Sequence, residues 1–248
     1  MAESASKLKK SFEVSKKMTD ATQQPLELYH LSHDLRGPLN SILGFCELLL
    51  EGIEGPLNEN QETDLAAIYQ SAQNLLGLIS NLVDLSKLEA GRLIFDPGEV
   101  ALGDVFEDVL GFNFRTTKPE QVELVANMPN GLPPIVGDFD RIEQMVMNFV
   151  RFAFRMTKTG QVVLAAENHG QAVTIQISIK ALVLSAKQLA ELFELAVHTD
   201  KVGRSELGPG GLELPLVRSL AEAHQGQVWA QSEEKTGTTL YLKLPTSQ

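Results

Sequence analysis

The chain has 248 residues, of which 43% are hydrophobic, so it is long enough to bury the core of one large domain or two small ones. Its 32 acidic residues outnumber its 21 basic residues, and the net charge of −11 argues against nucleic acid or an anionic membrane as the main partner. A single cysteine, Cys46, excludes an intramolecular disulfide and a cysteine metal cluster, and no apolar run approaches the ~18 residues of a membrane span. We therefore expect a cytoplasmic protein.

The first half of the chain has the pattern of a helical hairpin. Residues 1–24 are polar and are expected to form a tail. Apolar residues then recur at spacings of three and four, first at Leu28, Leu31, Leu35, Leu39, Ile42, Cys46 and Leu49, and again at Leu65, Ile68, Ala72, Leu75, Ile79 and Leu82. The stretch 51–60 between them contains glycine and proline and predicts a turn. One antiparallel hairpin leaves apolar surface uncovered, so we expect two chains to form a dimeric four-helix bundle.

After Gly91 the pattern changes to short strands mixed with helices. Strands are expected at RLIF, VELVA, QVVLAA, AVTIQISI, QVWAQS and TTLYLKL, and helices near 101–112, 139–156, 185–195 and 212–224. This mixture predicts an α/β sandwich with helices on one face of a sheet. The predicted fold class is therefore α+β, with a tail at 1–24, a hairpin at 25–92 and a second domain at 93–248.

The stretch SHDLRGPLN places a histidine and a proline in the first helix. With Leu28 and Leu35 at position a of the heptad, His33 falls at the outer position f. Pro38 lies inside the same helix, where it lacks an N–H and clashes with the carbonyl four residues earlier, at a cost of roughly 3 kcal/mol. A bend beside an exposed histidine suggests a functional site. The alternative is a kink that only helps the hairpin to fit its partner.

The sequence SHDLRGPLNSILGFCELL resembles the phosphoacceptor motif of two-component sensor histidine kinases. His33, Asp34, Pro38 and Leu39 match this motif, whereas Gly37 stands where the family usually has Thr or Asn. The resemblance implies that His33 accepts a phosphoryl group on Nε2 and that Asp34 accepts a hydrogen bond from Nδ1–H, which fixes the tautomer. It also implies that the Thr or Asn orients a hydrolytic water, so Gly37 argues against phosphatase activity.

The remainder of the chain resembles the ATP-binding domain of the same family, and the likeness covers roughly residues 25–245 in all. In that family, one helix carries two Asn residues four positions apart, and the second gives an oxygen to the Mg²⁺ of bound ATP. Here Asn148 is the first, and Phe152 stands in the second place, where a phenyl ring offers a hard cation no ligand. Phe152 shares the expected nucleotide face with Asn148 and Arg155, and it either widens the core or fills the pocket.

Two further nucleotide-binding elements depart from the family pattern. The loop that usually reads Asp-x-Gly-x-Gly aligns with SIKALVLSAKQL, which places Ile179 at the adenine-binding Asp and Ala181 and Val183 at the glycines. The last glycine motif survives in part as GPGGLELPLV, with Gly208, Gly210 and Gly211. Glu213 replaces its final glycine, where a carboxylate would repel a triphosphate. The remaining glycines either cradle phosphate at the helix start or merely form its entry loop.

These observations favour a histidine phosphotransferase built on the frame of a histidine kinase. His33 would take a phosphoryl group from the aspartate of one response-regulator receiver domain and pass it to another, with no cofactor expected in this chain. One alternative is an active histidine kinase with a divergent pocket, which would need ATP and Mg²⁺. Another is a non-catalytic pseudokinase adaptor. The expected partners are a second copy of the chain and receiver domains, with neither nucleic acid nor a membrane.

Overall fold

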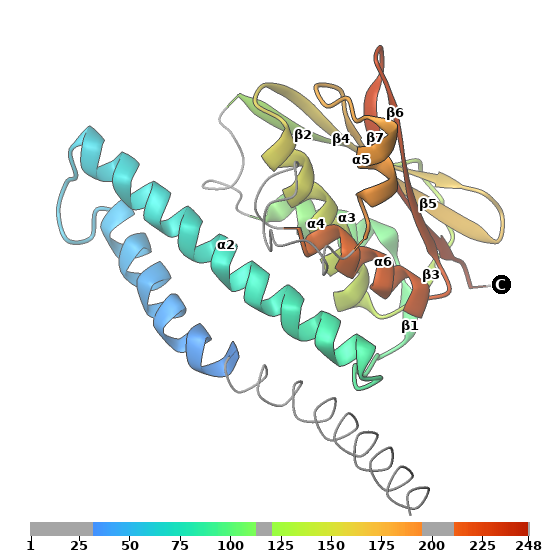
Figure 1. Ribbon diagram of the computed structural model, residues 1–248, viewed down its shortest axis with the longest axis horizontal. Coiled ribbons are helices and arrows are strands. Elements are labelled where there is room, and N and C mark those ends of the chain that lie inside the picture. Colours follow the sequence, from blue (N-terminus) through green and yellow to red (C-terminus); the bar gives the residue numbers. More distant parts are fainter. Residues whose placement is uncertain (1–31, 113–120, 195–210, 248) are drawn as a thin grey trace, which may run out of the picture. The chain divides into compact units, whose positions relative to one another are not determined.

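The computed structural model describes residues 32–112, 121–194 and 211–247 (Figure 1). The chain divides into two compact units, Met1–Leu93 and Ile94–Gln248. Several sequence expectations lie outside the described residues, namely those at Leu28, Leu31, Gly208 and Gly210.

The described part of the first unit is an antiparallel pair of helices, as predicted (Figure 1). The helix over residues 32–50 ends in a turn where Gly52 has a φ of +71°, a conformation that glycine adopts without strain. α2 (Glu59–Glu89) begins after Asn58, whose side chain accepts a hydrogen bond from the N–H of Gln61, while the Gln61 side chain accepts one from the N–H of Asn58. This reciprocal capping box fixes the start of α2.

The apolar residues of the hairpin form two stripes rather than one seam. Leu39, Leu43 and Ala72 form the buried centre between the helices, with Tyr69, Leu76 and Ile79 packed against it. Five residues of the predicted seams instead remain 37–49% exposed, namely Leu35, Ile42, Ile68, Leu75 and Leu82. The apolar face of each helix is therefore wider than contact with one neighbouring helix requires. The second stripe leaves an open apolar face on the hairpin.

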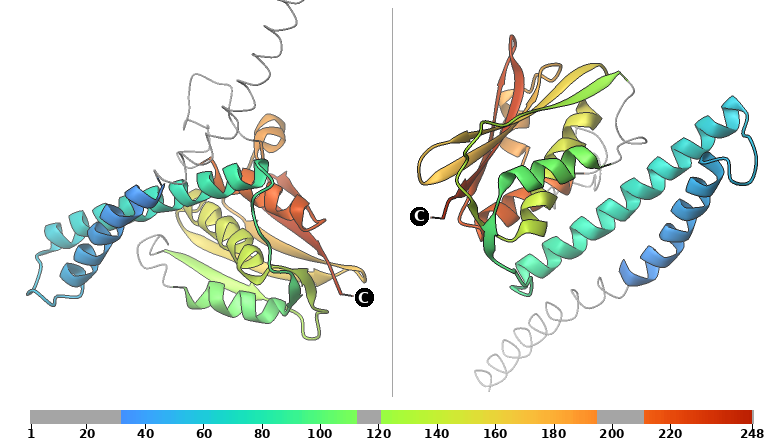
Figure 2. Two further views of the ribbon diagram at one scale, coloured as in Figure 1. Left: turned by 90° about the horizontal axis from the view of Figure 1, so that it is seen from below. Right: turned by 180° about the vertical axis from the view of Figure 1, so that it is seen from behind.

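The second unit is a five-stranded sheet with helices over one face, as the α+β prediction required (Figure 2). The strands are β2 (Val122–Asn127), β4 (Gly160–Asn168), β5 (Ala172–Ile179), β7 (Gly237–Pro245) and β6 (Gln227–Glu233), in that spatial order. β2 and β4 are parallel, and the other neighbours are antiparallel. The helices are α3 (Leu102–Gly111), α4 (Phe139–Met156), α5 (Ala186–Glu191) and α6 (Glu213–Ala223). A short antiparallel pair, β1 (Gly98–Val100) and β3 (Ile135–Gly137), lies outside the main sheet.

The stretch RLIF was predicted to be a strand, and this was wrong. The first strand of the second unit, β1, begins only at Gly98. Side chains hold this segment instead of a strand ladder. The ring of Phe95 meets the ring of His224 edge-on at 5.2 Å, and the N–H of Asp96 donates to the carboxylate of Asp138 at 2.9 Å. Pro97, which follows, has no N–H to give to a ladder.

Candidate functional sites

His33 lies near the start of the described part of the first helix and faces solvent. The side chains of His33 and Asp34 are each 80% exposed, and Nδ1 of the imidazole lies 3.7 Å from Oδ1 of the carboxylate. This separation is longer than a hydrogen bond, so the carboxylate acts on the ring as a nearby negative charge. That charge favours a proton on Nδ1 and leaves the lone pair on Nε2.

One hydrogen bond joins the helical turn that carries this histidine to α2. Arg36, one helical turn later, donates from Nη2 to Oγ of Ser80 on α2 at 3.4 Å. Ser32, on the other side of the histidine, is only 3% exposed. The exposed imidazole therefore stands on a turn of helix that the Arg36–Ser80 hydrogen bond joins to α2.

The helix continues without interruption through Gly37 and Pro38. Pro38 has no N–H to give to the carbonyl of Asp34, so this carbonyl lacks its helical partner one residue after the histidine. The hydroxyl of Ser41 donates to the Gly37 carbonyl at 3.2 Å. A methyl group added at Gly37 would meet no packed atom within 4 Å, so packing does not require glycine here.

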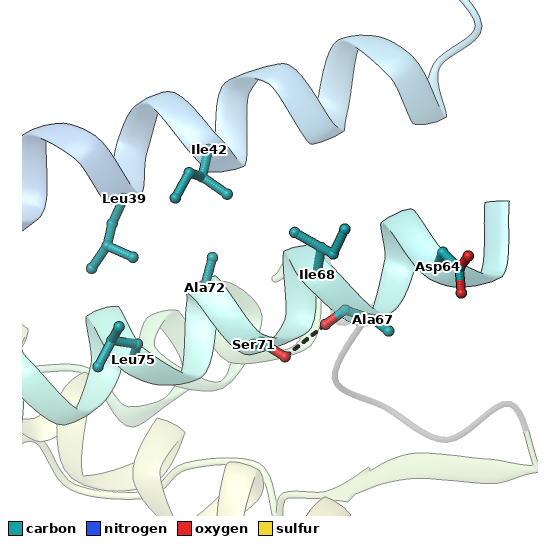
Figure 3. Close-up of a pocket in the computed structure, with 8 residues that line it drawn as sticks. All are labelled: Leu39, Ile42, Asp64, Ala67, Ile68, Ser71, Ala72 and Leu75. Atoms are coloured by element: carbon teal, nitrogen blue, oxygen red, sulfur yellow. Dashed lines mark hydrogen bonds between the residues drawn. The ribbon is translucent and has the colours of Figure 1, made fainter. Parts of the chain in front are cut away.

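An open groove of about 610 Å³ lies on the apolar face of the hairpin (Figure 3). Its lining residues are Leu39, Ile42, Asp64, Ala67, Ile68, Ser71, Ala72 and Leu75. The hydroxyl of Ser71 is turned back to the carbonyl of Ala67 at 2.8 Å, which satisfies its donor within the helix. Asp64 adds a carboxylate at one end, and the rest of the groove is suited to an apolar partner.

In the second unit, α4 carries the residues that the resemblance places at the nucleotide. Its N-cap is Asp138, whose carboxylate accepts the N–H of Arg141 at 3.2 Å. Asn148 and Phe152 are each 2% exposed, so protein covers both side chains. Among the residues that the structure describes, Nδ2 of Asn148 has no hydrogen-bond partner, although most buried amide groups have one. Phe152 offers no oxygen at the position of the expected Mg²⁺ ligand.

Arg155, the third residue of this face, forms a two-pronged ion pair with Glu213 on α6. Its Nη1 and Nη2 donate to Oε1 and Oε2 of the carboxylate at 2.7 and 2.6 Å. The guanidinium also lies 5.5 Å from the centre of the Phe152 ring. Arg151, one turn earlier, lies 5.7 Å from the centre of the Phe112 ring, and burial lowers the pKa of its guanidinium. Sequence reasoning placed Arg155 and Glu213 separately at nucleotide positions but did not pair them.

The loop after β5, which aligns with the adenine-binding loop, is tied to the neighbouring strands. Ile179, at the position of the adenine-binding acid, is fully buried. The hydroxyl of Thr238 on β7 donates to the carbonyl of Leu182 at 2.8 Å, and the N–H of Leu184 donates to Oγ of Ser232 on β6 at 2.8 Å. The hydroxyls of Thr238 and Ser232 therefore hold this loop in place. The resemblance expects an acidic side chain here that contacts adenine, and the loop has none at Ile179.

Of the three predicted glycines, only Gly211 lies within the described residues. It is exposed in the turn before α6, and a methyl group added there would meet nothing within 4 Å. Neither packing nor a positive φ requires glycine at this position. Over the described ranges, no three or more His, Cys, Asp or Glu residues are grouped so that they could hold a metal ion. No helix in those ranges has the length and apolarity needed to cross a membrane.

Comparison with protein families gives two matches, one in each unit. Residues 26–91 match the His Kinase A (phospho-acceptor) domain. Residues 137–248 match the family described as histidine kinase-, DNA gyrase B-, and HSP90-like ATPase. The two matches follow each other in the chain in the order that the sequence motifs suggested.

Curated relatives match over most of the chain. The sensor histidine kinase GacS of Pseudomonas protegens is 33% identical over 223 residues, which are 88% of this chain and 24% of the relative. The non-motile and phage-resistance protein of Caulobacter vibrioides is 29% identical over 250 residues, or 98% of this chain and 28% of that protein. The chain thus spans about a quarter of the length of these relatives.

Solved structures show the same fold. The structure of full-length ShkA in complex with AMPPNP superposes with a TM-score of 0.63 at 25% identity, covering 90% of this chain and 46% of that one. The histidine kinase AdeS of Acinetobacter baumannii gives a TM-score of 0.58 at 20% identity, covering 87% and 98%. The second likeness bears on the fold alone.

Proposed function

We propose that this chain, which belongs to the two-component sensor histidine kinase family, exchanges phosphoryl groups between His33 and response-regulator aspartates without using ATP itself. The observation that carries the proposal is the exposed imidazole of His33 with its Nδ1 3.7 Å from Asp34. A nucleophile for phosphoryl transfer must be accessible and held in position, and this residue meets both requirements.

The proposed chemistry is a reversible transfer between oxygen and nitrogen. The Nε2 lone pair of His33 attacks the phosphorus of an aspartyl phosphate, the P–N bond forms, the P–O bond breaks, and the aspartate leaves as a carboxylate. The proton stays on Nδ1, so positive charge develops on the ring during the attack. The nearby carboxylate of Asp34 stabilises that charge. The reverse reaction passes the phosphoryl group to another receiver domain.

Three features of the second unit support the absence of ATP from this chemistry. Phe152 supplies no oxygen to Mg²⁺, which requires oxygen ligands. Ile179, buried and apolar, has no acceptor for an adenine amino group. Glu213 replaces the final glycine of the motif that the resemblance places beside the phosphates, and its carboxylate engages Arg155 there. The described residues therefore do not fit ATP with Mg²⁺.

A second copy of the chain is the proposed partner of the open apolar face, since the family usually dimerises through this domain. Ile42, Ile68 and Leu75 are 42–49% exposed and line one groove (Figure 3). A second hairpin packed against this groove would remove these side chains from water and complete a four-helix bundle.

The test follows acid-labile label on the purified chain mixed with a phosphorylated receiver domain. Wild type should gain label, and His33→Ala should gain none. His169→Ala is the matched control, because His169 is also exposed, with 51% of its side chain accessible, but lies in the second unit. Label on wild type from ATP and Mg²⁺ alone would instead favour the active-kinase alternative. No label from any receiver domain would favour the adaptor.

A further inference from the structure

The Arg155–Glu213 pair is favoured by the position of each residue in its helix. Arg155 lies in the last turn of α4, and Glu213 is the first residue of α6. A cation is stabilised near a helix C-terminus and an anion near an N-terminus, so both helix dipoles support the pair. Its partial burial, with side chains 28% and 14% exposed, limits competition from water.

The pair also uses the donors that a phosphate would need. Both outer nitrogens of the Arg155 guanidinium are engaged by the two oxygens of Glu213, at 2.7 and 2.6 Å. A two-pronged pair of this kind is the geometry in which arginine also binds phosphate. One flank of the guanidinium is covered as well, because the ring of Phe152 lies against it at 5.5 Å. An external phosphate would have to displace Glu213 to form the same two-pronged contact with these two nitrogens.

We propose that Glu213 is a built-in anion that occupies Arg155 and thereby excludes nucleoside di- and triphosphates from the α4–α6 face. This inference rests on the proposed function, because the contact would explain how a domain of the ATP-binding type serves phosphotransfer without using ATP. Phe152 acts separately, since it removes a metal ligand but leaves the guanidinium in place. The departures from the family pattern at Phe152 and at Glu213 therefore have separable effects.

This separation gives a specific expectation for the variants. Without the carboxylate, Arg155 regains two donors for phosphate, so a diphosphate should bind. Because Phe152 remains, the binding should not depend on Mg²⁺. Glu213→Gln removes the charge but keeps the size and one acceptor, which protects the fold. Glu213→Gly restores the residue that the family usually has at this position.

The experiment is calorimetric titration of the full chain with ADP, with and without Mg²⁺. Wild type should show no saturable binding. Glu213→Gln and Glu213→Gly should bind ADP with a dissociation constant at least about tenfold below the weakest one that the titration detects, because a like charge has been removed from the site. The double variant Arg155→Ala/Glu213→Gln should return to the wild-type result. Glu222→Gln is the control, because Glu222 lies on the same helix but pairs with Arg218.

Two negative outcomes have different meanings. In the first, wild type shows no ADP binding, and the Glu213 variants bind ADP no better although circular dichroism shows that they are folded. The role proposed for Glu213 is then wrong, and the proposed phosphotransfer is unaffected. If wild type itself binds ADP or ATP with Mg²⁺, the proposed function without ATP fails together with the exclusion. Binding that persists in the Arg155→Ala/Glu213→Gln variant would also overturn the role given to Arg155.

Discussion

The backbone N–H of Asp138 donates a hydrogen bond to Nε2 of His224 at 3.1 Å, and this contact joins the start of α4 to the end of α6. The other ring nitrogen lies 2.8 Å from the carbonyl of Leu220, so the geometry assigns the proton to Nδ1. The Asp138 carboxylate also accepts the N–H of Asp96. The first segment of the second unit is thereby anchored where these two helices meet.

Replacing His224 by alanine should destabilise the second unit. The change removes the acceptor of a buried N–H and the edge-on contact with Phe95. We expect the free energy of unfolding to fall by about 2–4 kcal/mol. Trp229, the single tryptophan, lies in β6 and reports this unit by its fluorescence during denaturation. His169→Ala should change stability little, and equal stability of both variants would contradict the assigned contact.

Asp34→Asn should slow phosphoryl transfer without unfolding the hairpin. The amide keeps the shape of the carboxylate but removes the charge that stabilises the developing imidazolium. We expect the initial rate of labelling from a phosphorylated receiver domain to fall by about tenfold to a hundredfold. Glu62→Gln, on α2, is a charge-matched control. An unchanged rate would remove Asp34 from the mechanism.

The sequence predicted those parts of the fold that depend on local periodicity. Spacings of three and four located both helices of the hairpin, and alternation located β4, β5 and β7, because burial on one face repeats within a few residues. The spacing placed Ile42 in the inner seam, and this was wrong, because Leu43 is the buried residue and Ile42 is 42% exposed. Both lie on the broad apolar face of the first helix, so spacing alone does not separate them. β1 and β3 have three residues each, too few for a period to be recognised.

The candidate sites were predictable to the extent that their residues are close in sequence. His33 and Asp34 are adjacent, and a heptad placed His33 on the outer side of the helix, where its side chain is 80% exposed. Arg155 and Glu213 are 58 positions apart, and their pairing depends on how α4 packs against α6. No local pattern contains that information. The carboxylate was therefore interpreted as a repulsive charge, although the fold gives it a cationic partner.

Gly37→Asn should introduce phosphatase activity if the side chain at this position orients water, as the resemblance implies. Space beside Gly37 is open, since an added methyl group meets no packed atom within 4 Å. The hairpin should therefore keep its fold. We expect faster loss of phosphate from a phosphorylated receiver domain, measured as released inorganic phosphate. Gly37→Ala adds bulk without a polar group and should not show this gain.

Glu143→Gln should stabilise the second unit in a manner that depends on pH. Burial raises the pKa of Glu143, as do Asp108 and Asp140, and Arg151 opposes them in part. A raised pKa in the folded state means that stability is lost as the pH rises and the carboxyl ionises. The variant should therefore unfold at a higher temperature than wild type near neutral pH. This difference should disappear in acid, below the ordinary pKa of a glutamate, and a difference that grew there would contradict the assignment.

Leu75→Lys should separate the proposed dimer. Leu75 is 46% exposed in the single chain and lines the groove on the hairpin, so a second hairpin would bury it. In a two-fold symmetric dimer the substitution occurs twice. Because about half of each Leu75 side chain is already covered in the single chain, losing the rest of the burial at both sites costs about 1.5–3 kcal/mol of association free energy. That loss raises the dissociation constant by roughly tenfold to a hundredfold, and the charge of the two lysines raises it further. Sedimentation equilibrium should then report a monomer at concentrations where wild type is a dimer. Ile94→Lys, at a residue 87% exposed outside the hairpin, should leave the dimer intact. A Leu75→Lys variant that keeps the wild-type mass would place the interface elsewhere.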